Sequence, residues 1–140
     1  MKADSNVCEL SIGTPCPELV ERTGASNWCI LTACNPRASR ASDRYNLSAT
    51  ESLKQELLAM NPRHLYPSVN VSDDDDSGGG WPDEPGFLFS WEERDDVLAL
   101  ARQFGQLGVV CARRGGIPEL WLMTRPGFRP LPAHVRVPAA

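Results

Sequence analysis

Several side chains spread along the chain could together bind an anionic or nucleotide-like ligand. The side-chain amides of Asn35 and Gln106 each donate and accept hydrogen bonds. Arg37, which is followed by Arg40 and Arg44, can pair with a carboxylate or a phosphate. An aromatic platform, and a carboxylate that could accept from a ligand amine, complete the set. The candidate ligand-binding residues are Thr32, Asn35, Arg37, Trp81, Glu84 and Gln106.

The same residues also have purely structural interpretations. Asn35 precedes a proline and can bond its own backbone in a turn, whereas Gln106 can satisfy the carbonyls that end a helix. Glu84 can be the ion-pair partner of Arg37, and Trp81 can close the end of a core. If their segments converge, Asn35, Glu84 and Gln106 can form one hydrogen-bonded network that locks the loops without a ligand. The sequence leaves these alternatives open.

Catalysis has weaker support. The chain has no phosphate-binding P-loop, no GxSxG motif and no HExxH motif. Only Cys34, as a nucleophile, and Glu84, as a general acid or base, stand out as reactive candidates. A nucleophilic Cys34 needs a base such as His64 beside it. The sequence therefore favours a protein without catalytic activity.

The metal-binding residue types are not spaced as ligands. No CxxC pair occurs among the cysteines, and both histidines lie far along the chain from Cys29 and Cys34. We expect reduced, mostly buried thiols, no metal and no cofactor, because free cysteine behaves as a small hydrophobe. The aspartate run 73–76 lacks the spaced ligands of an EF-hand, which favours a charged hairpin tip over a calcium site. The cysteines are Cys8, Cys16, Cys29, Cys34 and Cys111.

Composition excludes some partners. The formal net charge of -4 and the missing RNP1 pattern argue against nucleic acid. The first residues contain no apolar stretch of a secretory signal, and no run reaches the roughly 18 apolar residues of a membrane span. We therefore expect a cytoplasmic protein that has no contact with a membrane.

Hydrophobic periodicity predicts five strands and two helices. Ser48 with Glu51, and Ser90 with Glu93, form capping boxes that start the helices, and Gly105 is the expected C-cap of the second. Pro67 favours an edge position for the second strand. The predicted strands are 28–33, 64–71, 87–89, 109–112 and 119–123, and the predicted helices are 48–60 and about 91–104.

This order predicts a fold of the α+β class. It is the ferredoxin-like β-α-β-β-α-β two-layer sandwich with an additional C-terminal strand. Residues 1–26 form an N-terminal arm, 27–124 the α+β domain, and 125–140 a proline-rich tail on the surface. Trp28 and Trp121 could share a sheet face that the helices leave bare. That face would bind a protein partner or form a homodimer, unless the arm or the tail covers it.

Chain direction then places three segments together. In this topology the first strand ends, the hairpin after the second strand turns, and the second helix ends, all at the same edge of the sheet. The residues at this edge are 32–37 (TACNPR), 80–86 (GWPDEPG) and 104–106 (FGQ). The opposite end carries Ser90, Trp91 and the hairpin at 113–114.

These segments also carry a family resemblance. The stretches LTACNPRAS, WPDEPGFLF and LARQFGQLGVV resemble a small bacterial domain family of unknown function, number 3293 among the domain families. The similarity covers about residues 27–122. It implies a bacterial (or phage) cytoplasmic origin and, because the family has no established activity, it implies no reaction.

The sequence thus predicts a non-catalytic binding or protein-interaction module, with a polar site where the TACNP, WPDEPG and FGQ segments meet. The alternatives are a binder of a small anionic or nucleotide-like ligand, and an enzyme that uses Cys34 and Glu84.

Overall fold

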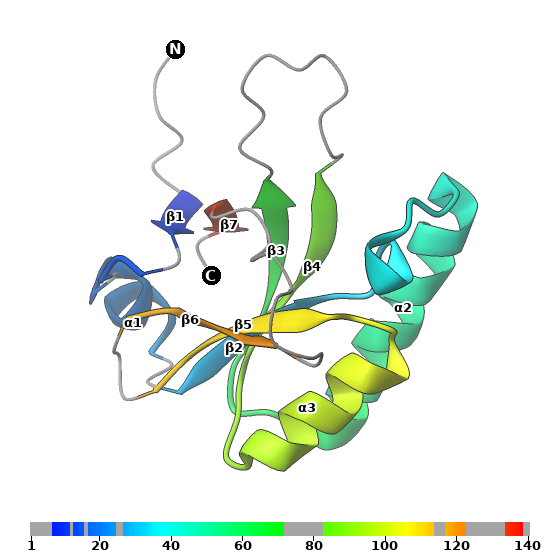
Figure 1. Ribbon diagram of the computed structural model, residues 1–140. Coiled ribbons are helices and arrows are strands. Elements are labelled where there is room, and N and C mark those ends of the chain that lie inside the picture. The colour runs from blue at the N-terminus through cyan, green and yellow to red at the C-terminus, as the bar shows by residue number, and fades with distance from the viewer. Residues whose placement is uncertain are drawn as a thin grey trace, which may run out of the picture.

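The computed structural model describes residues 7–11, 13–15, 17–24, 27–71, 83–113, 117–122 and 134–138. These residues form one seven-stranded sheet with the strand order β1-β7-β3-β4-β2-β5-β6, in which every neighbouring pair is antiparallel (Figure 1). The strands are β1 (Val7–Ser11), β2 (Trp28–Thr32), β3 (Leu65–Val71), β4 (Glu84–Ser90), β5 (Gly108–Ala112), β6 (Glu119–Leu122) and β7 (His134–Pro138). The helices are α1 (Pro17–Thr23), α2 (Asp43–Met60) and α3 (Arg94–Gln103), with a short 3-10 helix, η1 (Pro36–Ala38), after β2.

The sheet confirms the predicted mixture of helices with antiparallel strands. β2 and β4 lie side by side at its centre, with β3 outside β4 and β5 outside β2. The sheet is twisted, and in Figure 1 the strands β3 and β4 run in a clearly different direction from β2 and β5.

The two faces of the sheet are covered by different helices. Cys29 and Leu31 of β2 pack with Leu53 of α2 and Val97 of α3. The alternate residues of β2 face the other way, because successive side chains of a strand point to opposite faces. On that second face Leu19 of α1 joins a separate cluster.

The expectation that Trp28 and Trp121 share a bare face is therefore wrong. Trp28 belongs to the α1 cluster and Trp121 to the α2/α3 cluster, and both are buried. For Trp28, the alternative that the N-terminal arm covers the face is the one observed, since Leu19 of α1 lies in the same cluster.

Both helices begin at different residues from those expected. The N-cap of α2 is Ser42, whose Oγ accepts a hydrogen bond from the Tyr45 amide at 3.1 Å, so Ser48 lies inside the helix. The N-cap of α3 is Glu93, without a side-chain cap. Ser90 is not the cap because its Oγ accepts from the His64 amide at 2.9 Å, which ties β4 to the start of β3.

The ends of the chain contribute two strands that the sequence analysis missed. β7 pairs with both β1 and β3, so part of the predicted surface tail lies within the sheet. The edge position predicted for β3 is also wrong. Pro67 is tolerated because β7 pairs only with Val69–Val71, beyond the proline that lacks an N–H. The aspartate run 73–76 and Trp81 lie outside the described residues.

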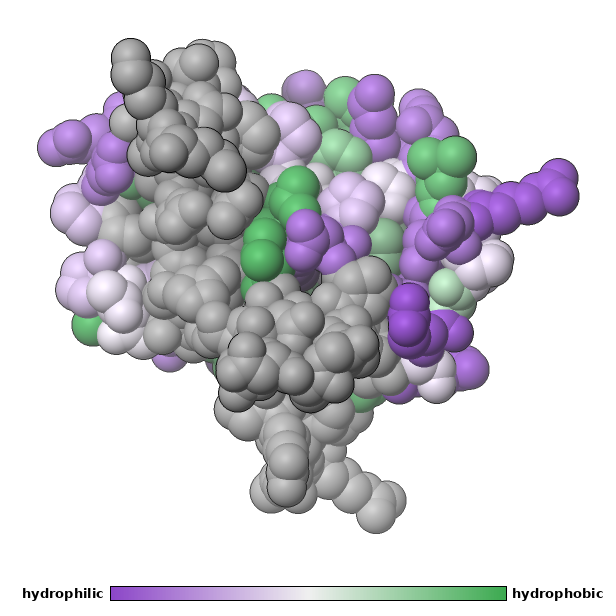
Figure 2. Space-filling model, turned by 90° about the horizontal axis from the view of Figure 1, so that it is seen from above, coloured by the Kyte–Doolittle hydropathy of each residue, from purple (hydrophilic) through white to green (hydrophobic). Residues whose placement is uncertain are grey.

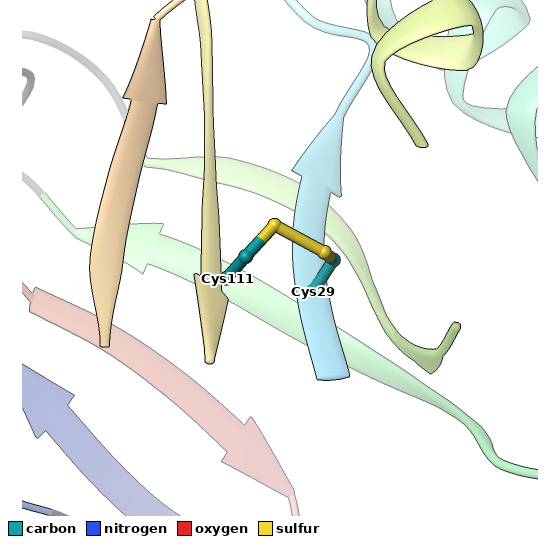
Figure 3. The surroundings of a disulfide bond; sticks show 2 residues. All are labelled: Cys29 and Cys111. Carbon is teal, nitrogen blue, oxygen red and sulfur yellow. A yellow bond between two sulfur atoms is a disulfide. The ribbon is translucent and has the colours of Figure 1, made fainter. Parts of the chain in front are cut away.

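One expectation about the cysteines is overturned. Cys29 and Cys111 form a disulfide between the neighbouring strands β2 and β5 (Figure 3), with a Cα–Cα distance of 4.2 Å. The register places them directly opposite each other, although 82 residues separate them in sequence. Cys34 is a free, buried thiol as expected. Among the described residues, no helix is both long enough and apolar enough to cross a membrane.

Candidate functional site

Three of the predicted site residues meet inside the molecule. Asn35 follows β2, Glu84 begins β4 and Gln106 follows α3. Their side chains are 4%, 9% and 7% exposed, respectively. Because buried polar groups are costly unless they are hydrogen-bonded, the contacts of these three residues decide what this region can do.

Asn35 is the centre of these contacts. Its Nδ2 donates to Glu84 Oε2 at 2.6 Å, and its Oδ1 accepts from the Ala41 amide at 2.8 Å and from Asn46 Nδ2 at 2.9 Å. Its own amide donates to Asn46 Oδ1 at 2.8 Å. One side chain thus connects β4, α2 and the loop before α2. Its short bond to Glu84 has a carboxylate acceptor, and such bonds are the stronger class.

Gln106 attaches the end of α3 to the same loop. Its Nε2 donates to the Cys34 carbonyl at 3.0 Å and to the Phe104 carbonyl at 3.2 Å. The Arg37 amide donates to the Gly105 carbonyl at 2.7 Å. Gly105 has a positive φ of 68°, and a Cβ there would lie 2.8 Å from Pro36 Cβ. Only glycine therefore permits both this helix end and this close contact.

Thr32 and Cys34 complete the contact between β2 and β4. Thr32 Oγ1 donates to the Pro85 carbonyl at 3.0 Å and accepts from the Cys34 amide at 3.0 Å. The Cys34 thiol lies 3.7 Å from the Pro85 carbonyl oxygen and 3.6 Å from Thr50 Oγ1. At 2% exposure, this sulfur is enclosed rather than presented to a substrate. We call the side chains of Thr32, Asn35, Asn46, Glu84 and Gln106 the polar network.

The polar network holds the backbone of the loop after β2 in an uncommon conformation. Asn35 (φ 48°) and Arg37 (φ 58°) both adopt the left-handed region. Asparagine tolerates this region, whereas for an arginine it costs roughly 1–2 kcal/mol. The surrounding contacts must maintain it, and such local strain is concentrated at functional segments of proteins.

The accessible part of this region carries three arginine side chains. Arg37, Arg40 and Arg44 are exposed, and none forms an ion pair with a residue in the described part of the chain. We call these three side chains the arginine rim. Figure 2 looks onto the molecule from above, and hydrophilic side chains gather there beside apolar ones toward the right, the side of α2 in Figure 1. The apolar side chains exposed on α2 include Tyr45 and Leu47.

The predicted site residues therefore fall into three groups. Thr32, Asn35, Glu84 and Gln106 are brought together and buried. Arg37 joins them through its backbone, while its side chain is exposed and makes no ion pair with Glu84. Trp81 lies outside the described residues.

Sequence reasoning missed several polar partners. Asn46 was missed because the first helix was predicted to begin at residue 48. In the structure the N-cap is Ser42, so Asn46 lies in the first turns of α2. Asn70 lies directly opposite Glu84 in the β3–β4 register. The Oγ of Ser68 and the Oδ1 of Asn70 are buried and have no hydrogen-bond partner within the described ranges. The pairing of Asn70 with Glu84 was missed because β4 was predicted to begin at Phe87, whereas it begins at Glu84.

The described residues thus form an antiparallel sheet with α2 and α3 on one face. The buried polar network holds the loop after β2, from which the side chains of Arg37 and Arg40 are exposed. The chain belongs to the DUF3293 family of proteins of unknown function, whose model matches residues 31–109. The matched range contains all three segments that meet at the polar network, so the predicted family is confirmed. No curated protein and no solved structure matched the sequence.

Proposed function

We propose that this chain is a non-catalytic bacterial (or phage) binding module, and that its arginine rim recognises an anionic group. Arg37, Arg40 and Arg44 have no carboxylate partner among the described residues, although the chain carries an excess of acidic residues. An arginine that is exposed and unpaired remains available for a carboxylate or a phosphate of a ligand or of a protein partner.

The observation that carries this proposal is the way in which the loop is held. Asn35 and Gln106 use their amides on Ala41, Asn46, Glu84 and backbone carbonyls, so they position the loop rather than contact a ligand. A loop that is fixed before binding loses little conformational entropy when a ligand arrives.

The strand order supports the finer topology that we propose. β3, β4, β2 and β5 follow the order of a ferredoxin-like unit, with α2 and α3 packed in one core cluster on the same face. In that unit β1, β7, β6 and α1 are additions. The proposed cytoplasmic location is an expectation from the amino-acid sequence and from the family resemblance.

An enzyme that uses Cys34 and Glu84 has less support. The thiol is buried between a carbonyl and a hydroxyl group, and Glu84 is bonded to Asn35. Iodoacetamide should therefore modify Cys34 in the folded protein much more slowly than a free cysteine in a peptide. Rapid alkylation of Cys34 in the folded protein would revive the catalytic alternative.

The test of the proposal is a titration with anions. Inorganic phosphate, citrate, ATP and an acidic peptide are compared by thermal shift and then by calorimetry. At least one of them should raise Tm, because a ligand that binds only the folded state stabilises it. Arg37→Gln should weaken that binding about tenfold, which corresponds to about 1.4 kcal/mol.

Arg102→Gln on α3 is the matched control, because Arg102 is also exposed and has no ion pair within the described residues. It should leave the affinity unchanged. If none of the four anions binds, or if both substitutions weaken binding equally, the arginine rim is not a recognition site.

A further inference from the structure

A concave region lies at the opposite end of the sheet from the polar network. This lower pocket has a volume of about 490 Å³, within the range of roughly 300–1,000 Å³ that is typical of small-molecule sites. Its walls come from the loop before β2, the end of α2, the start of β3 and the β4–α3 loop, near the bottom of Figure 1.

The segments that line the lower pocket are bonded to one another. The Ser90 amide donates to the His64 carbonyl at 3.0 Å, and Ser90 Oγ accepts from the His64 amide at 2.9 Å. The Trp91 amide donates to the Asn27 carbonyl at 3.2 Å. Because these bonds join three loops directly, the shape of the pocket exists before any ligand binds.

Charge indicates what the lower pocket would bind. Glu92, Glu93 and Asp96 line it, against the single cationic side chain of Arg63. None of the three carboxylates forms an ion pair with a residue that the structure describes. The carboxyl end of α2 also reaches the pocket and adds the negative end of its helix dipole. The positive end of the α3 dipole is offset by Asp96 and by its neighbour Asp95, in the first turn of that helix.

The lower pocket also has an apolar part. Met60 lies in its wall and is 44% exposed. The pocket is also lined by the half-buried Trp91 and by Val97. A charged group alone would leave this surface uncovered, whereas an alkyl stem would remove it from water.

We propose that the lower pocket binds a small organic cation: an ammonium or guanidinium group on an apolar stem. Glu92, Glu93 and Asp96 accept the charged head, and Met60 and Trp91 contact the stem. A free diamine and the side chain of a lysine in a peptide both have this chemistry. This site is separate from the arginine rim, and it needs no anion to be bound there.

The test uses two probes, one double variant of the pocket carboxylates and one control variant beside the pocket. Cadaverine represents the free diamine, and N-acetyl-lysine methylamide represents the peptide-bound side chain. Binding to the full chain is followed by calorimetry and by amide chemical shifts in physiological salt. At least one probe should bind, with shifts centred on the β4–α3 loop, and the tighter probe identifies the source of the cation.

Glu92→Gln combined with Asp96→Asn should weaken that binding at least about tenfold, roughly the effect of losing one charge-assisted bond. Asp95→Asn should change it less than about twofold, because Asp95 is exposed in the same turn but does not line the pocket and is screened by salt. An equal effect of the two changes would reveal only a general attraction to an acidic protein. That result, or the failure of both probes to bind at millimolar concentration, overturns the proposal.

Discussion

Removing the buried Asn35 side chain should strongly destabilise the protein. The side chain makes three hydrogen bonds, of which one reaches the Glu84 carboxylate and two come from Ala41 and Asn46. A bond to a charged group contributes about 1.5–3 kcal/mol and a neutral one about 0.5–1.5 kcal/mol. We therefore expect Asn35→Gly to lower the free energy of unfolding by about 2.5–6 kcal/mol, the sum of these contributions.

Glycine is the informative substitution because the backbone of Asn35 is left-handed, with φ 48°. Asn35→Ala would add roughly 1–2 kcal/mol of backbone cost to the lost hydrogen bonds, so the difference between the two variants measures the conformational part. The control is Asn61→Gly. Asn61 has a nearly identical backbone (φ 52°) at the C-cap of α2, but it is exposed and its side chain has no bond within the described residues.

The assay is equilibrium unfolding in urea, followed by circular dichroism at constant m-value. Asn61→Gly should stay within about 0.5 kcal/mol of the parent protein. A loss below about 1 kcal/mol for Asn35→Gly would refute the reasoning, because the polar network would then contribute little to the fold. Asn35→Asp is a third variant, which places a second carboxylate beside Glu84. The loss in the free energy of unfolding should become smaller as the pH falls, because protonation of one carboxyl group removes the repulsion.

Three further changes test other parts of the structure. Ser42→Ala should cost about 1 kcal/mol in thermal or urea unfolding, and Ser48→Ala less than half of that, because only Ser42 caps α2. Gly105→Ala should cost about 2 kcal/mol or more, since a Cβ would be strained at positive φ and would collide with the loop after β2; a neutral effect would show that the loop yields. Non-reducing peptide mapping should recover Cys29 linked to Cys111, and reduction should lower stability by up to about 4–5 kcal/mol for a loop of 82 residues; equal unfolding midpoints with and without reductant would contradict the disulfide.

The main strands of the central sheet could be predicted from the sequence because their signals are local. The apolar run from Trp28 to Thr32, for example, is buried at every position, as expected for a strand that is covered on both faces. Helix starts were less predictable. Ser48 carries the stronger local signal, because Glu51 completes a capping box and Ser42 has no such partner. The contacts of Asn46 with Asn35 nevertheless extend the helix back to Ser42.

The strands β1 and β7 and the disulfide could not be predicted, because they depend on pairing between segments that are distant in sequence. In β7, Val135 and Val137 alternate with His134 and Arg136, but this pattern is too short to predict a strand by itself. β1 and β7 become strands because each supplies backbone partners to the other and β7 also pairs with β3. The disulfide is similar, because a register slip of one residue would turn Cys29 and Cys111 to opposite faces of the sheet.

The sequence by itself determined the five strands β2 to β6, the helices α2 and α3, their order and, through chain direction, the meeting of the Asn35, Glu84 and Gln106 segments. Only the tertiary structure decided that these amides bond to Glu84, Asn46 and backbone carbonyls. It also decided that Arg37 is the side chain left in solvent. The physical reason is that periodicity and capping are encoded within a few residues, whereas the burial of a polar side chain depends on atoms that distant segments place around it.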